Sequence, residues 1–126
     1  MEGREREARF VVAKEDTALI VGSGTLLVLA TPRLISKIEN LAMSMVQEEL
    51  GEGETTVGTN VNINHIRATP VGCCVKVVSK VVKVDGRKIV YEVCAYDDVE
   101  KIAEGTHERY IVDVDRFFLK AQKKLQ

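Results

Sequence analysis

Residues 55–72 read TTVGTNVNINHIRATPVG and carry the strongest indication of how this chain folds. From residue 57 to residue 66 the side chains alternate with the period of two that is typical of a half-buried strand. The alternation predicts that one face carries Val57, Thr59, Val61, Ile63 and His65, and that the other carries Gly58, Asn60, Asn62, Asn64 and Ile66. A histidine in an inward-facing row is more often structural, but it can act as an acid or base where a hydroxyl or carboxylate meets it.

A long helix is predicted upstream of this strand, over about residues 32–49. Thr31 and Pro32 form a typical helix start, because a threonine oxygen can cap free N–H groups and proline fits the first helical position. One apolar stripe follows at helical spacing, and it consists of Leu34, Ile38, Leu41, Ala42 and Met45. Gly51 and Gly53 then end the helix. The width of the stripe predicts that the helix is buried against a sheet.

The other apolar segments predict β-strands. They are Arg9–Ala13, Ala18–Val21, Cys74–Val84, Lys88–Tyr96 and Lys101–Val112. Asp85-Gly86 is a typical two-residue hairpin turn, and residues 120–126 are expected to form a solvated tail. The fold class is therefore α+β. We expect a single domain, residues 1–126, with one long central helix (about 32–49) wrapped by an antiparallel sheet of five to six strands.

Composition excludes several functions. The 126 residues include 18 basic and 19 acidic side chains, and the net charge of −1 provides no broad field for a nucleic-acid backbone. No apolar stretch is long enough to span a bilayer, and the charged start MEGREREARF lacks the apolar centre of a signal peptide. The three cysteines lack metal-binding spacing, so reduced thiols and no metal site are expected. We therefore expect a cytoplasmic protein without nucleic-acid or membrane partners.

Three side chains are candidates for chemistry. Thr31 offers a hydroxyl at the helix start, Glu39 a carboxylate at the border of the apolar stripe, and His65 an imidazole from the sheet. Each also has an ordinary alternative role, as a helix cap, a solvated glutamate and a structural histidine. The spacing permits all three to converge where free N–H groups at the helix N-terminus could polarise a carbonyl.

Four segments resemble the fluoroacetyl-CoA thioesterase-like branch of the hot-dog superfamily, in matching order and separation. They are ATPRLISKIEN (30–40), TTVGTNVNINHIRATPVG (55–72), VDGRKIVYEV (84–93) and GTHERYIVD (105–113). The resemblance implies hydrolysis of a small or short-chain acyl-CoA thioester to the free acid and CoA, with coenzyme A as part of the substrate and no cofactor. It also implies a homodimer that joins two sheets edge to edge, with active sites at the subunit interface. Further pairing into a tetramer is left open.

By motif position, the resemblance implies that Thr31, Glu39 and His65 are catalytic and that Gly58 and Arg109 lie near the acyl group. From the residues alone, Gly58 could instead mark a bulge, and Arg109 could form a surface ion pair. His65 is expected to be the general base, with Thr31 as the attacking hydroxyl or as the group that orients water. Glu39 would hold these groups in place, or be the base itself.

One feature departs from the family pattern. No Phe, Tyr or Trp occurs between Phe10 and Tyr91, so the segment before the helix cannot place an aromatic ring over a fluorinated acyl group. Residues Leu26–Leu29 indicate an aliphatic wall and a broader range of short acyl groups. A non-catalytic acyl-CoA-binding module, or sensor, is the main alternative function. A hydratase or dehydratase of the same fold ranks lower, because its aspartate-histidine block is missing. His107 is expected to be structural.

Overall fold

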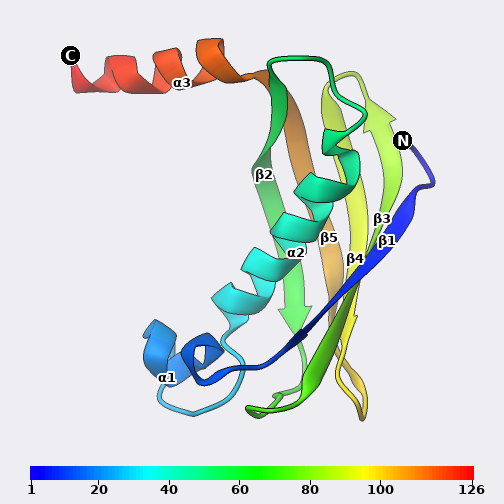
Figure 1. Ribbon diagram of the computed structural model, residues 1–126, viewed down its shortest axis with the longest axis vertical. Helices are drawn as coiled ribbons and strands as arrows, with labels where there is room; N and C mark the ends of the chain where they lie inside the picture. The colour runs from blue at the N-terminus through cyan, green and yellow to red at the C-terminus, as the bar shows by residue number, and fades with distance from the viewer.

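The structure, a computed structural model, describes all 126 residues. Five strands form one antiparallel sheet in the order β1-β3-β4-β5-β2. They are β1 (Glu5–Val11), β2 (Glu54–His65), β3 (Cys74–Asp85), β4 (Lys88–Tyr96) and β5 (Lys101–Asp113). The long helix α2 (Thr31–Gln47) crosses one face of the sheet, and β2 forms an edge (Figure 1). The predicted α+β hot-dog fold is confirmed.

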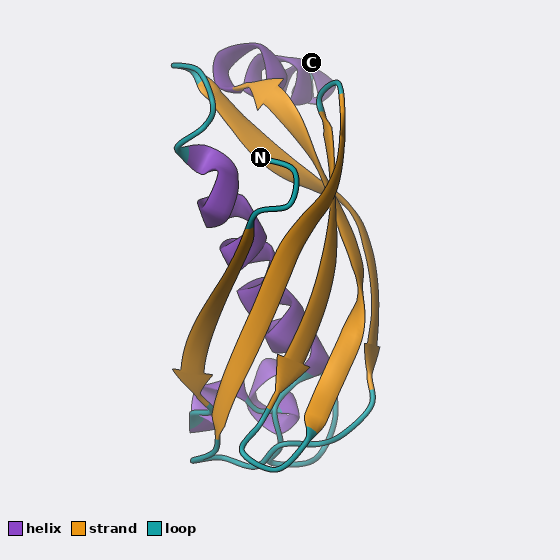
Figure 2. Ribbon diagram, turned by 90° about the vertical axis from the view of Figure 1, so that its right-hand side faces the viewer, coloured by secondary structure: helices purple, strands orange, loops and turns teal.

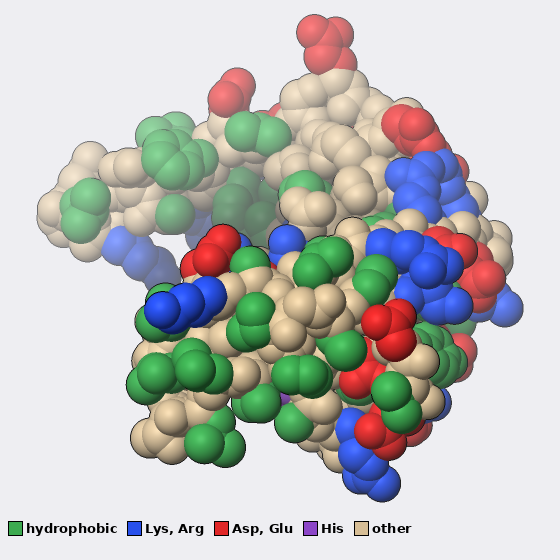
Figure 3. Space-filling view, turned by 60° about the horizontal axis from the view of Figure 1, so that its bottom comes forward, with side chains coloured by type: hydrophobic (Ala, Val, Ile, Leu, Met, Phe, Trp, Pro, Cys, Tyr) green, Lys and Arg blue, Asp and Glu red, His purple; other side chains and the backbone are tan.

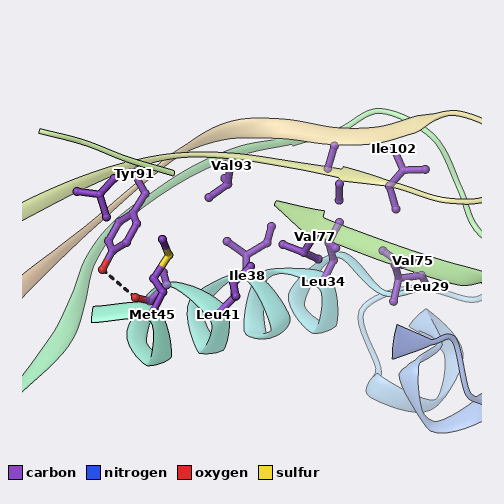
Figure 4. Close-up of a cluster of buried hydrophobic side chains, with 14 of the residues drawn as sticks. Leu29, Leu34, Ile38, Leu41, Met45, Val75, Val77, Tyr91, Val93 and Ile102 are labelled. Atoms are coloured by element: carbon purple, nitrogen blue, oxygen red, sulfur yellow. Dashed lines mark hydrogen bonds between the residues drawn. The ribbon is translucent and has the colours of Figure 1, made fainter. Parts of the chain in front are cut away.

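Figure 2 shows α2 lying along one face of the twisted sheet. The hydrophobic core is made of side chains from both. The apolar stripe predicted for the helix is buried, because the sheet covers it with Val75, Val77, Tyr91, Val93 and Ile102. In Figure 4 the Tyr91 ring reaches down to the helix, where its hydroxyl donates to the Ala42 carbonyl at 2.9 Å. This buried bond fixes α2 against β4 near the middle of the molecule.

The predicted strand Ala18–Val21 is wrong, because this segment forms a short helix, α1. Gly22 adopts a left-handed conformation with φ 90°, and its N–H donates to the Ala18 carbonyl, which closes a helical turn. A single turn is too short for its apolar pattern to distinguish helix from strand. The side chains of Leu19 and Ile20 are exposed.

Several boundaries also differ from the predictions. The long helix ends at Gln47, and β1 already begins at Glu5. The hairpin turn is Gly86-Arg87, because Asp85 still pairs with Lys88 and Gly86 carries the positive φ of 62°. The residues of the predicted tail are exposed but helical: they belong to α3 (Val114–Gln122) and a following 3₁₀ turn, Lys123–Leu125. None of the helices combines the length and the apolar character that a membrane crossing requires.

A β-bulge at Thr59 changes which side chains of β2 face the helix. Gly58 pairs with Arg109 of β5 and Asn60 pairs with Glu108, so Thr59 has no partner. The alternation is therefore correct from Val61 to His65 but wrong before the bulge, where Thr56 and Gly58 face inward in place of Val57 and Thr59. The bulge brings Gly58 to the same face of the sheet as His65. The opposite face of β2 carries the side chains of Asn60, Asn62 and Asn64.

Candidate active site

Thr31 and His65 meet at the end of the molecule that also carries α1. Thr31 is the first residue of α2, and its Oγ1 lies 2.7 Å from Nδ1 of His65, the last residue of β2. The predicted capping role of Thr31 is wrong, because the N-cap is Ala30 and no side chain caps this helix. The N–H groups of Arg33 and Leu34 already bond to the Ala30 carbonyl, so fewer helix donors are free than expected. The Thr31 hydroxyl instead forms a hydrogen bond with the His65 imidazole.

The second ring nitrogen of His65 is buried and lacks a partner. No atom of the chain forms a hydrogen bond with Nε2. Burial lowers the pKa of His65 below its ordinary value of 6.5, and a smaller contribution from the Arg67 backbone opposes this. Buried polar atoms are nearly always paired, so Nε2 is free to bond to a group from outside this chain. The imidazole is thus held neutral and ready to accept a proton.

A cavity of about 320 Å³ opens beside this pair. Val28 and Leu29 form an aliphatic part of its wall, and Ile66, Arg67 and Ala68 form part of the rim beyond His65. Phe, Tyr and Trp are absent from the lining, while the predicted wall residues Leu26 and Leu27 are exposed beyond it. Figure 3 shows hydrophobic side chains gathered over this end of the molecule, with a histidine only just visible between them.

The other predicted site residues form a second cluster, further along the same helix and strand. Glu39 Oε2 lies 3.8 Å from Arg109 Nη1. A Cβ atom on Gly58 would approach Glu39 Oε2 to 2.8 Å and Arg109 Nη1 to 3.3 Å, so a side chain at this position would press on the ion pair. Arg109 is 6% exposed, and its Nε and Nη2 donate to the side chain and backbone oxygens of Thr56. Arg109 is therefore buried at the site and does not form the surface ion pair considered above.

His107 supports Arg109 from behind. It is fully buried, stacks on Tyr91, and its Nδ1–H donates to the Asn60 carbonyl at 2.7 Å. With Nδ1 protonated, Nε2 is free to accept from Arg109 Nη1, which lies 3.3 Å away. Burial lowers the pKa of His107, and the neighbouring guanidinium acts in the same direction. A neutral imidazole thus accepts a hydrogen bond from the Arg109 guanidinium.

The two clusters are not joined within one chain. Thr31 and Glu39 are eight residues apart on α2, which corresponds to about 12 Å along the helix axis. Gly58 and His65 lie near opposite ends of the exposed part of β2, roughly 20 Å apart. The structure therefore brings Thr31 to His65, and Glu39 to Gly58 and Arg109, but it leaves Glu39 away from the imidazole. The expected convergence of all three groups does not occur inside a single subunit.

Thr56 is a site residue that the sequence did not identify, because a threonine on a strand carries no signal of an arginine partner. The arrangement contains no group of three or more His, Cys, Asp or Glu side chains that could hold a metal ion. The three cysteines, Cys73, Cys74 and Cys94, are unpaired.

Comparisons with known proteins agree on one family. The profile of the family described as "Fluoroacetyl-CoA-specific thioesterase" matches residues 12–115. A fluoroacetyl-CoA thioesterase from Streptantibioticus cattleyicolor is 33% identical over 97 residues, which cover 77% of this chain and 70% of that protein. The solved structure of the fluoroacetyl-CoA thioesterase FlK superposes with a TM-score of 0.94 at 28% identity, covering 98% of this chain and 96% of that one. A variant of FlK in complex with acetyl-CoA also gives 0.94, at 27% identity, with 100% and 99% covered.

Proposed function

The chain belongs to the fluoroacetyl-CoA-specific thioesterase family and is a thioester hydrolase, and from this premise we propose that it hydrolyses the CoA thioesters of short-chain acids. The observation that carries the proposal is the 2.7 Å contact between the Thr31 hydroxyl and His65 Nδ1 at the wall of a small cavity. A hydroxyl bonded to a neutral imidazole is the arrangement that nucleophilic and general-base catalysis both require.

The acyl group is proposed to be short and aliphatic, without restriction to fluoroacetate. Val28 and Leu29 provide apolar contacts, and no aromatic ring of the same chain lines the cavity. Each methylene in such a pocket discriminates by only about 1–3 kcal/mol. Acetyl-CoA, propionyl-CoA and butyryl-CoA should therefore be turned over at rates that differ gradually, and fluoroacetyl-CoA should not stand out by orders of magnitude.

In the proposed mechanism His65 is the general base. Its Nδ1 takes the proton of the Thr31 hydroxyl, or of a water that Thr31 orients, as the oxygen attacks the thioester carbonyl. The C–S bond then breaks, and the departing CoA thiolate receives the proton from the imidazolium. On the Thr31 route a water hydrolyses the acyl-threonine ester in the same way. Proton transfer to Nδ1 requires the proton of the neutral ring to lie on Nε2, the atom that has no partner in the chain. A carboxylate placed at Nε2 would fix that tautomer and stabilise the imidazolium formed during attack. Mass analysis of acid-quenched enzyme for an acylated Thr31 separates the two routes.

We propose that this carboxylate is Glu39 of a second subunit. β2 is a twelve-residue edge strand, much of it exposed, and a free edge of this kind readily pairs with another chain. Antiparallel pairing of two β2 strands about Asn62 places His65 of one subunit opposite Gly58 of the other, because the bulge at Thr59 absorbs one residue. The partner's Glu39 then approaches the orphaned Nε2. The homodimer would contain two such composite sites.

In the same register, similar side chains lie opposite each other along the rest of the strand. On the outer face, Asn62 meets the partner's Asn62, and Asn60 meets the partner's Asn64; on the inner face, Val61 meets the partner's Ile63. Amide side chains can hydrogen-bond with each other across a strand pair, and the two aliphatic side chains extend the core. No offset by a single residue preserves both pairings, since it would exchange the faces.

A cysteine scan tests this register. Asn62→Cys lies on the proposed two-fold axis, where opposed Cα atoms fall within disulfide range, so oxidation should link the dimer. Asn60→Cys is the matched control: two copies of it would be separated by about 13 Å and should link only to Asn64→Cys in a mixture. Efficient self-linking of Asn60→Cys would show that the axis passes elsewhere.

The activity itself is tested by free-thiol release from a panel of acyl-CoA esters. Thr31→Ala and His65→Ala should lose turnover while still binding CoA. Tight acyl-CoA binding without any thiol release by the parent protein would instead support the sensor. We place the reaction in the cytoplasm, since three unpaired cysteines suit a reducing compartment.

A further inference from the structure

The C-terminal helix α3 extends away from the rest of its own chain. It leaves the end of β5 and projects outward past the edge strand β2 (Figure 1). Asp113 caps its start by accepting from the Arg116 N–H at 3.0 Å. Isolated helices of this length are marginal in water, so a nine-residue helix is expected to rest against another surface.

One side of α3 is apolar along its whole length, and all of it is open to solvent. The stripe continues into the 3₁₀ turn and consists of Val114, Phe117, Phe118, Ala121 and Leu125. Phe118 is 62% exposed and Leu125 is 85% exposed. The remaining surface carries four basic side chains, Arg116, Lys120, Lys123 and Lys124, together with Asp115 and Leu119. Two exposed phenylalanines in one stripe indicate a binding surface.

We propose that this stripe binds a second copy of the chain and clasps the end of the partner that holds the Thr31–His65 cavity. The inference rests on the proposed β2–β2 pairing. In that register Gly58 lies opposite the partner's His65. Glu54 is four residues before Gly58, at the start of β2, so it lies opposite the segment that follows His65 in the partner. Because Glu54 pairs with Asp113, α3 begins at that point and runs on toward the partner.

The surface that α3 would meet is complementary to it. It consists of two loops, Ile66–Cys73 and Asp97–Glu100, which we call the end loops. The end loops expose Ile66, Val71 and Val99, the last of them 82% exposed. They also expose the carboxylates of Asp98 and Glu100, which face a helix with four basic side chains. An ion pair of 3.3 Å between Arg67 and Glu100 ties the two loops together.

The contact would complete the rim of the active site. Ile66 and Arg67 belong both to the end loops and to the lining of the cavity. A helix from the partner seated on them would hold this part of the rim in place. Each subunit would then supply its partner with Glu39 on one side of the site and with α3 on another.

Two neighbouring substitutions test the clasp. Phe118→Glu introduces a charge into the stripe, whereas Leu119→Glu introduces the same charge on the opposite side of the helix at 59% exposure. Phe118→Glu should raise the dimer dissociation constant by about tenfold or more, as expected for a buried aromatic anchor, and Leu119→Glu should leave it nearly unchanged. Equal effects of the two variants on dimerisation would overturn the proposal.

A photo-crosslinker at position 118 identifies the occupant directly. Chains labelled with ¹⁵N and unlabelled chains are mixed, and the products are mapped by mass spectrometry. Heavy–light crosslinks into the end loops support the clasp; links within one chain, or capture of α3 by anionic lipid vesicles with dimerisation unaffected by Phe118→Glu, refute it. If Asn62→Cys still links the dimer while position 118 misses the end loops, the clasp alone fails. A strictly monomeric protein would refute both proposals.

Discussion

The absence of a side chain at Gly58 can be tested by adding one methyl group. In Gly58→Ala the new Cβ would lie 2.8 Å from Glu39 Oε2, closer than real Cβ contacts come. The carboxylate is the end of a flexible side chain, so it should retreat by about 0.6 Å to reach ordinary contact at 3.4 Å while the strand stays in place. A displacement of about 1 Å in a catalytic group can cost on the order of 100-fold in rate. We therefore expect kcat to fall about tenfold.

The free energy of unfolding of Gly58→Ala should rise slightly or stay almost unchanged. Gly58 does not adopt a positive φ, so alanine fits its backbone conformation. Alanine reduces the entropy of the unfolded chain by an amount worth roughly 0.5–1 kcal/mol, which offsets the strain of moving Glu39. The melting temperature should therefore change by only a few degrees. Gly51→Ala is the matched control, because its Cβ would also meet a glutamate oxygen, at 3.1 Å, far from the site.

The assay is steady-state thiol release with propionyl-CoA, combined with thermal unfolding of the same preparations. Gly58→Ala should lower kcat with little change in melting temperature, and Gly51→Ala should change neither. Glu39→Asp withdraws the carboxylate from the new methyl group, so its effect in the Gly58→Ala background should be smaller than in the parent. Full parental kcat in Gly58→Ala, together with a large loss in Glu39→Gln, would show that the position of the carboxylate is not limited by this glycine.

Three further outcomes are expected. His65→Ala should lower kcat by about two to four orders of magnitude, and a loss below threefold would remove His65 from the chemistry. The value of kcat/KM should rise with pH as His65 loses its proton, and burial lowers the pKa of that step. Glu39→Gln removes a nearby negative charge in the dimer, so it should lower the pKa of His65 further and move the acid limb of the profile to lower pH. A shift to higher pH would contradict the proposed pairing. His107→Leu leaves the Asn60 carbonyl without its donor and should lower the unfolding free energy by about 1–3 kcal/mol in chemical denaturation; an unchanged value would show that this buried bond contributes nothing to stability.

The sequence predicts the parts of this fold that repeat with a regular period. The apolar stripe of α2 and the alternation from Val61 to His65 both follow from burial of one face, and both are present. The resemblance to the family added what periodicity cannot supply, since nothing in the spacing alone pointed to Gly58 or Arg109. Periodicity failed where one residue breaks the register: Thr59 lacks a partner, and although Gly58 was recognised as a possible bulge, its position alone does not say which neighbouring residue is left unpaired.

Short segments were also beyond sequence reasoning, for a different physical reason. Four apolar residues at Ala18–Val21 fit either a strand or a turn of helix, and the choice depends on the Gly22 conformation and on tertiary contacts. Thr31 looked like a helix cap because its type suits one, but Ala30 occupies the N-cap position and the Thr31 hydroxyl bonds to the distant His65. Competition between a local partner and a distant one cannot be resolved from local sequence.

The separation of Thr31, at the start of α2, from Glu39, at its middle, makes a sharp prediction about mixed dimers. If Glu39 completes the partner's site, a dimer of one Thr31→Ala chain and one Glu39→Gln chain contains one fully intact site and one doubly defective site. Mixing the two inactive proteins in equal amounts and allowing subunits to exchange should make half of the dimers mixed, and so restore about a quarter of the parental activity. If instead each chain assembled its own site, every site in the mixture would carry one substitution and no activity would return. Recovery therefore depends on the arrangement that leaves Nε2 of His65 without a partner in a single chain.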